Sequence, residues 1–157
     1  MNTNFEFPLS EKGDIVFRID RYNSSLFEIA KLKDDGESSA YNAVRFGLDK
    51  LNELCKLVEL GLKTKKSDIA MLTTKINGTQ VRILNKFGLF NAEYHDYLFS
   101  YTDWGGSDKY DFHPWYNNYT ECDKGIRLTE EECSELLAIL RLFILTKEKY
   151  RKSKRNT

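Results

Sequence analysis

Two amphipathic segments, offset by 82 residues, constrain the fold of this chain more than any other feature. Apolar residues recur in each at intervals of three or four, a spacing that places side chains on one face of an α-helix. The first stripe is Leu51, Leu54, Cys55, Val58 and Leu62, and the second is Cys133, Leu136, Leu137, Leu140 and Ile144. We therefore expect two helices, each with one face buried in a core.

The expected helix ends carry recognisable signals. Asp49 can cap the first helix, because a carboxylate accepts the free backbone N–H groups of a helix start. Gly61 and the basic segment 63–66 predict its end. Thr129 and Glu132 have the spacing of a capping box, in which each side chain bonds the backbone of the other residue. A basic tail, 147–157, follows the second helix.

Strand-forming segments precede each helix. Alternating or β-branched residues predict strands at 14–22, 26–33 and 43–48 in the first half, and at 71–76, 79–85 and 93–102 in the second. Polar residues predict a turn at 34–39, and Asn77–Gly78 predicts a tight hairpin turn. The Gly-, Asp- and Asn-rich stretch 104–123 is expected to be an ordered loop. The predicted fold is α+β: antiparallel strands followed by an amphipathic helix, duplicated over about 10–63 and 68–146 within one domain, 1–157.

Composition limits the possible functions. Lys and Arg number 24 and balance 24 Asp and Glu, and this neutrality counts against a purely electrostatic nucleic-acid binder. Three cysteines are too few for a disulfide framework. The first ten residues lack the pattern of a signal peptide, and no apolar run is long enough to span a membrane. We therefore expect a cytoplasmic protein without membrane contact.

One stretch and one hairpin resemble a known group of proteins. The stretch 123–132, which reads Asp-Lys-Gly-Ile-Arg-Leu-Thr-Glu-Glu-Glu, is similar to the segment that joins the last strand of a PC4-like unit to its helix. The hairpin beginning at 17–22 is similar to the first strand pair of that unit. The chain thus resembles the PC4-like, Whirly and PUR single-stranded nucleic-acid binders, in which two units of curved antiparallel sheet and helix pack together. The chain departs from these proteins at Cys133, near which it lacks their usual tryptophan.

The resemblance implies binding of single-stranded nucleic acid on a sheet face, with cations on phosphates and aromatic rings on bases. The candidate residues are Arg18, Arg21, Tyr22, Lys31, Lys75, Arg82 and Lys86. Arg18 and Arg82 alternate with the apolar residues of their strands, so we expect both on the open face.

An alternative function follows from the aromatic residues. The range 87–119 holds 12 of the 21 aromatic side chains, and Tyr and Trp are enriched in protein interfaces. Within 104–123, the candidates are Trp104, Trp115 and Tyr116. They would suit a small protein-interaction module, such as an inhibitor or adaptor carried by a phage or mobile element. Open sheet edges would also allow a homodimer.

The sequence contains no recognisable catalytic or metal-binding pattern. The two histidines, His95 and His113, lack the paired spacing of zinc ligands, and Gly105–Gly106 does not form a phosphate-binding loop. Asp–His pairs such as Asp111 with His113 are common in sequences and carry little weight. We therefore expect no enzyme activity, no cofactor and no metal ion.

Overall fold

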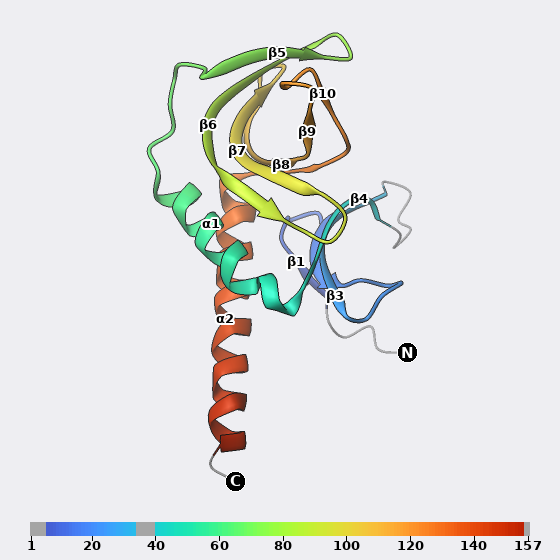
Figure 1. The fold of residues 1–157 in the computed structure, drawn as a ribbon, viewed down its shortest axis with the longest axis vertical. Helices are drawn as coiled ribbons and strands as arrows, with labels where there is room; N and C mark the ends of the chain where they lie inside the picture. The colour runs from blue at the N-terminus through green and yellow to red at the C-terminus, as the bar shows by residue number, and fades with distance from the viewer. Residues whose placement is uncertain (1–5, 34–39, 156–157) are drawn as a thin grey trace.

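The computed structural model describes residues 6–33 and 40–155 (Figure 1). The first half forms a four-stranded antiparallel sheet, called here the first sheet, in the order β1-β2-β3-β4. Its strands are β1 (Glu6–Pro8), β2 (Ile15–Ile19), β3 (Leu26–Leu32) and β4 (Ala40–Gly47). Alternation in β2 and β3 sends Phe17 and Ile29 into the core. The turn expected at 34–39 lies outside the described residues.

The second half forms a five-stranded antiparallel sheet, the second sheet, in the order β11-β8-β7-β6-β5. Its strands are β5 (Leu72–Ile76), β6 (Thr79–Asn91), β7 (Asp96–Trp104), β8 (Asp108–His113) and β11 (Ile126–Leu128). The pairing of β6 with β7 shifts register twice, and such bulges bend a strand. Figure 1 shows the resulting curl. The expected Asn77–Gly78 turn is confirmed, with positive φ at both residues.

The stretch 104–123 is not the loop that its composition predicts. It contains β8 and a two-stranded hairpin formed by β9 (Trp115–Tyr116) and β10 (Glu121–Cys122). Alternate residues of β8 are fully buried aromatics, Tyr110 and Phe112, so burial of their rings outweighs the local turn preference of the surrounding Asp residues.

Both predicted helices are present. A 3₁₀ turn, η1 (Leu48–Lys50), leads into α1 (Leu51–Lys63), so Asp49 lies in this turn and makes no side-chain cap. Gly61 does not end α1 but lies within it. The predicted capping box is confirmed at the start of α2 (Glu130–Arg155): Thr129 N donates to Glu132 Oε1 at 2.7 Å, and Glu132 N donates to Thr129 Oγ1 at 3.2 Å.

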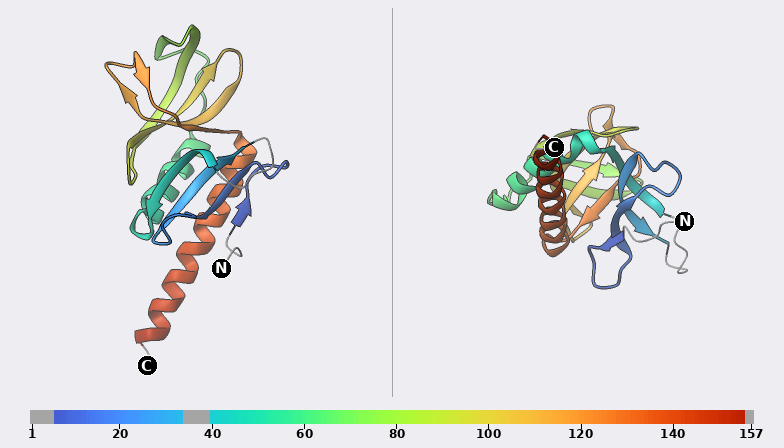
Figure 2. Two further views of the ribbon diagram at one scale, coloured as in Figure 1. Left: turned by 90° about the vertical axis from the view of Figure 1, so that its right-hand side faces the viewer. Right: turned by 90° about the horizontal axis from the view of Figure 1, so that it is seen from below.

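Helix α2 continues through the segment expected as a tail, as far as Arg155. Its C-terminal part extends past the rest of the protein in Figures 1 and 2. Neither helix in the described part of the chain is long and apolar enough to cross a membrane.

One hydrophobic core joins both sheets and both helices. A run of aromatic contacts connects the sheets: the Phe46 ring lies 6.1 Å from Phe17 and 5.5 Å from Phe90, and Phe112 lies 4.5 Å from Phe99. The α+β class with antiparallel sheets is confirmed. Each sheet precedes a helix in the chain, but α1 packs on β6 and β7 of the second sheet, whereas Phe143 of α2 contacts Phe17 of the first.

Candidate binding cleft between the two sheets

One face of β7 and β8 is buried although its side chains are polar. Ser100 and Thr102 of β7 lie on the same face as Asp111 and His113 of β8, because side chains alternate along each strand and Ser100 pairs with Asp111. All four are buried. Burial of polar groups is costly without partners, so their hydrogen bonds decide what this face can do.

Asp111 is the hub of this polar cluster and is fully buried. Its Oδ2 accepts from Thr102 Oγ1 at 2.9 Å and from Arg127 Nε at 3.3 Å, and its Oδ1 is bonded to His113 Nδ1. This contact to Nδ1 leaves Nε2 as the other ring nitrogen of His113. Asp111 thus fixes the orientation of the imidazole.

Arg127, on the edge strand β11, lies opposite Asp111 in the register. One of its terminal nitrogens donates to the carbonyl oxygens of Thr102 at 2.8 Å and Ser107 at 2.9 Å. Burial lowers the pKa of the guanidinium, and Asp111 opposes that shift. The strands therefore hold a partly desolvated cation at a fixed place.

Trp104 covers this cluster. Its ring stacks on His113 at a centroid distance of 4.9 Å, and the guanidinium carbon of Arg127 lies 6.0 Å from the ring centre. Four buried side-chain atoms make no hydrogen bond among the described residues: Asn42 Oδ1, Ser100 Oγ, Trp104 Nε1 and Trp115 Nε1. Leaving such a group unpaired costs about 1–3 kcal/mol.

Trp104, His113 and Arg127 line a cleft of about 880 Å³. The remaining lining comes from 9–15 at the start of the first sheet, from Lys31 and Asn42, from Lys109 and 125–126, and from 129–132 at the start of α2. This volume is within the usual range for ligand sites, about 300–1,000 Å³. Asn42 also lines an adjoining hollow of about 490 Å³.

Gly125 lets the chain pass close to the imidazole. A Cβ at this position would lie 1.9 Å from the Phe112 carbonyl oxygen and 2.7 Å from two atoms of the His113 ring. Any other residue would displace β11 from β8. The glycine in the stretch 123–132 therefore has a steric reason to be there.

The cleft is charge-balanced. Its cationic side chains are Lys12, Lys31, Lys109 and Arg127, and its acidic ones are Glu11, Asp14, Glu131 and Glu132. The two signs are partly segregated, because Lys109 and Arg127 belong to the second sheet, whereas the acids belong to the 9–15 segment and to α2. Such a lining favours a ligand with groups of both signs over a polyanion.

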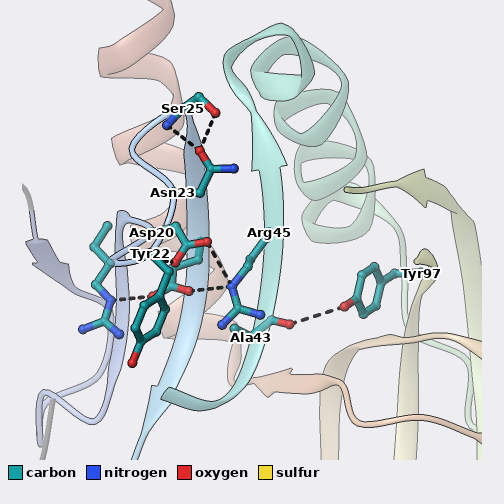
Figure 3. A network of polar contacts seen from close by, with 9 residues as sticks. Asp20, Tyr22, Asn23, Ser25, Ala43, Arg45 and Tyr97 are labelled. Carbon is teal, nitrogen blue, oxygen red and sulfur yellow. Dashed lines mark hydrogen bonds and ion pairs between the residues drawn. The ribbon is translucent and has the colours of Figure 1, made fainter. Parts of the chain in front are cut away.

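The predicted nucleic-acid residues do not gather on one face. Arg18 is only 4% exposed, with Nε 2.6 Å from Glu28 and a terminal nitrogen 3.0 Å from Glu6. The expectation that Arg18 lines an open face is therefore wrong: opposite charges on the neighbouring strands enclose it. Arg45 continues this ion-pair row, as Figure 3 shows at Asp20, and Tyr97 reaches from the second sheet to the carbonyl of Ala43.

The other candidates are dispersed. Arg82 pairs with Asp103 at 3.3 Å on the face of the second sheet opposite to Thr102 and Trp104, and Lys75 is exposed on that same face. Lys86 lies on the other face, where it pairs in register with Ser100, and its Nζ lies 2.9 Å from Tyr119 Oη. Three further candidates lie elsewhere: Arg21 and Tyr22 in the exposed β2–β3 turn, and Lys31 in the cleft.

The three aromatic candidates lie closer together. Trp104 lines the cleft, while Trp115 and Tyr116 of β9 line a hollow of about 310 Å³ between the β9–β10 hairpin and the second sheet. The Trp104 and Trp115 rings are 6.0 Å apart, and Tyr116 Oη lies 3.1 Å from His95 Nδ1.

Sequence reasoning missed most of the cleft. Lys109, Asp111 and His113 alternate with two aromatics in the order Lys-Tyr-Asp-Phe-His, which is itself a strand signal that could have put all three on one face. Nothing local in the sequence brings Asn42 to them.

Comparisons with protein-family models, with curated proteins and with solved structures found no match. In the described part of the chain, no three His, Cys, Asp or Glu side chains are grouped to hold a metal ion, and Cys55, Cys122 and Cys133 are unpaired.

Proposed function

We propose that this protein is a small protein-interaction module that holds a segment of a partner protein in the cleft between its sheets. One observation carries the proposal: Trp104 and Asn42 line the same cleft, and each has a buried polar atom, Nε1 and Oδ1, without a hydrogen-bond partner among the described residues. A bound segment reaches these two atoms when the side chains that cover them move aside. A peptide backbone offers an acceptor and a donor at nearly every residue, and could pair both atoms.

The side chains of the cleft support binding rather than catalysis. The hydroxyls that line it already have partners: Ser10 Oγ donates to Asp14 at 2.6 Å, and Thr129 Oγ1 caps α2. His113 therefore has no neighbouring hydroxyl that is poised as a nucleophile among the described lining residues. The balance of acids and cations also suits a protein segment, which carries both signs.

Selection of peptides from a displayed random library on the immobilised protein tests this proposal. Trp104→Phe keeps an aromatic ring but removes the indole N–H, so we expect selected peptides to bind the variant about tenfold more weakly. Trp115→Phe is the matched control, because its Nε1 is also unpaired but its ring lines the smaller hollow. The proposal fails if no peptide is selected, or if the two variants bind the selected peptides equally.

We propose single-stranded nucleic-acid binding as the second candidate, supported by Lys86 and by the rings of the hollow of about 310 Å³ next to it, where Lys86 contacts Tyr119. Lys86 Nζ lies 4.3 Å over the Tyr119 ring, and that ring lies 5.6 Å from Trp115. A cation beside neighbouring rings suits a phosphate and a stacked base, and each stacked base contributes about 1–3 kcal/mol.

Fluorescence anisotropy with a single-stranded oligonucleotide at two salt concentrations tests this candidate. Binding should weaken with salt and with Lys86→Glu. Lys56→Glu, on the exposed side of α1, is the charge-matched control. An affinity that responds equally to both substitutions would show non-specific attraction and would exclude the hollow as the site.

We further propose that the two successions of strands and helix are duplicated units, as in the PC4-like families that the chain resembles. Both sheets are antiparallel, and both helices bury stripes of the same spacing in the common core. The unpaired cysteines support a reducing compartment such as the cytoplasm.

A further inference from the structure

The wall of the cleft formed by the second sheet presents donors. Arg127 on β11 pairs with Asp111 on β8, and Lys109 precedes Asp111 by two residues, so Lys109 and Arg127 are diagonal neighbours on one face. Diagonal neighbours on adjacent strands have Cα atoms about 7–8 Å apart. The unpaired N–H of Trp104 belongs to the same wall.

Asp111 has little capacity left to neutralise these donors. Its two oxygens already accept from His113, Thr102 and Arg127. Lys109 makes no ion pair with any described residue. A ligand that supplies a negative acceptor at this wall would therefore gain from Lys109 and from the partly desolvated Arg127 together.

The rest of the lining limits how much negative charge can enter. It mixes four acids, Glu11, Asp14, Glu131 and Glu132, with two lysines, Lys12 and Lys31. The hydrogen bond from Ser10 lowers the pKa of Asp14. A chain of phosphates would meet these acids, whereas a single carboxylate needs only the neighbouring cations Lys109 and Arg127.

We infer that the partner segment is anchored by a carboxylate, the side chain of an Asp or Glu, bound by Lys109 and Arg127 beside the ring of Trp104. This inference rests on the proposed interaction function and names the chemistry of the partner. Charge-assisted hydrogen bonds are about twice as strong as neutral ones, so the ionised side chain binds better than its amide.

Two capped tripeptides, acetyl-Gly-Glu-Gly-amide and acetyl-Gly-Gln-Gly-amide, test the inference because they differ only in the charged group. Trp104 and Trp115 are the only tryptophans, so the ¹⁵N-labelled protein gives two indole N–H signals, which the Phe variants assign. The Glu peptide should shift the Trp104 signal and leave the Trp115 signal in place. The Gln peptide should bind about tenfold more weakly.

Lys109→Gln should reduce the affinity for the Glu peptide to that for the Gln peptide. Lys124→Gln, in the adjoining hollow, is the matched control and should change neither affinity. The dispersion of the backbone amide signals shows in the same spectra that each variant is folded.

Equal affinities of the two tripeptides would overturn the carboxylate inference, and so would a shift confined to Trp115. If library peptides still require Trp104 in that case, the interaction function stands without the anchor. If no library peptide requires Trp104, the proposed interaction function fails. The tripeptide titration then still shows whether Lys109 and Arg127 bind a carboxylate.

Discussion

The ion-pair row across the first sheet makes a quantitative prediction. Glu6, Arg18, Glu28 and Arg45 lie opposite one another in register on the four strands, so their charges alternate across the sheet. Glu28 is 1% exposed and contacts both arginines, at 2.6 Å from Arg18 and 3.1 Å from Arg45. Glu28→Gln keeps the shape of the side chain and removes only its charge.

The magnitude follows from the distances and from burial. At 2.6 Å and an effective dielectric constant of about 20, the attraction between Glu28 and Arg18 is about 6 kcal/mol before desolvation is subtracted. Removing one partner of a buried pair costs about 3–5 kcal/mol. Arg18 retains Glu6 and Arg45 retains Asp20, so we expect a loss at the lower end, about 3 kcal/mol.

Urea unfolding of the wild type and of Glu28→Gln measures this loss directly. Glu53→Gln is the control: Glu53 is 43% exposed and pairs with Lys50 at 3.5 Å, so its loss should stay below about 0.5 kcal/mol. A loss below about 1 kcal/mol for Glu28→Gln would refute the reasoning, because it would mean that desolvation cancels the attraction in this row.

Four further outcomes are expected. Gly61→Ala should destabilise by about 1–3 kcal/mol in urea unfolding although Ala is the better helix former, because its Cβ would lie 2.7 Å from the Phe99 ring; an unchanged midpoint would contradict that packing. Thr129→Ala should cost about 1 kcal/mol through loss of the cap, and a neutral result in thermal unfolding would show that the cap contributes nothing. Burial raises the pKa of Tyr97 to about 12, so its hydroxyl ionises first in the unfolded chain. The free energy of unfolding should therefore fall by about 2–3 kcal/mol from pH 10 to pH 12, and Tyr97→Phe should flatten that slope if the reasoning holds. Burial also raises the pKa of the Cys122 thiol to about 11, so alkylation near neutral pH should be about 100-fold slower than for a free thiol; labelling at the rate of the unfolded chain would contradict this.

Local signals predicted the helices and the hairpin turn well. The stripe residues Leu54 and Leu136 are fully buried, and the Thr129 cap forms, because helix periodicity and capping involve residues at most four positions apart. The Asn77–Gly78 turn forms for the same reason. The prediction that Gly61 ends α1 is wrong: Gly61 lies within the helix, where it makes room for the ring of Phe99, a residue far along the chain.

The cleft could be predicted only in part. The aromatic-rich stretch around Trp104 made it a candidate contact residue, and Trp104 does line the cleft. Arg18 was expected on an open face, since alternation shows which residues share a face but not what lies beside them. Its partners, Glu6 and Glu28, come from neighbouring strands and are fixed by strand pairing.

The sequence by itself determined the two buried helical stripes, the capping box and the β-hairpin, because these depend on contacts between near neighbours in the chain. The tertiary structure alone decided that α1 packs on the second sheet, that Arg18 is enclosed by acids, and that Asn42 lines the same cleft as Trp104 and Arg127. These outcomes depend on strand register and on packing between distant segments. A one-residue change of register would move every side chain to the other face, and no local pattern encodes that choice.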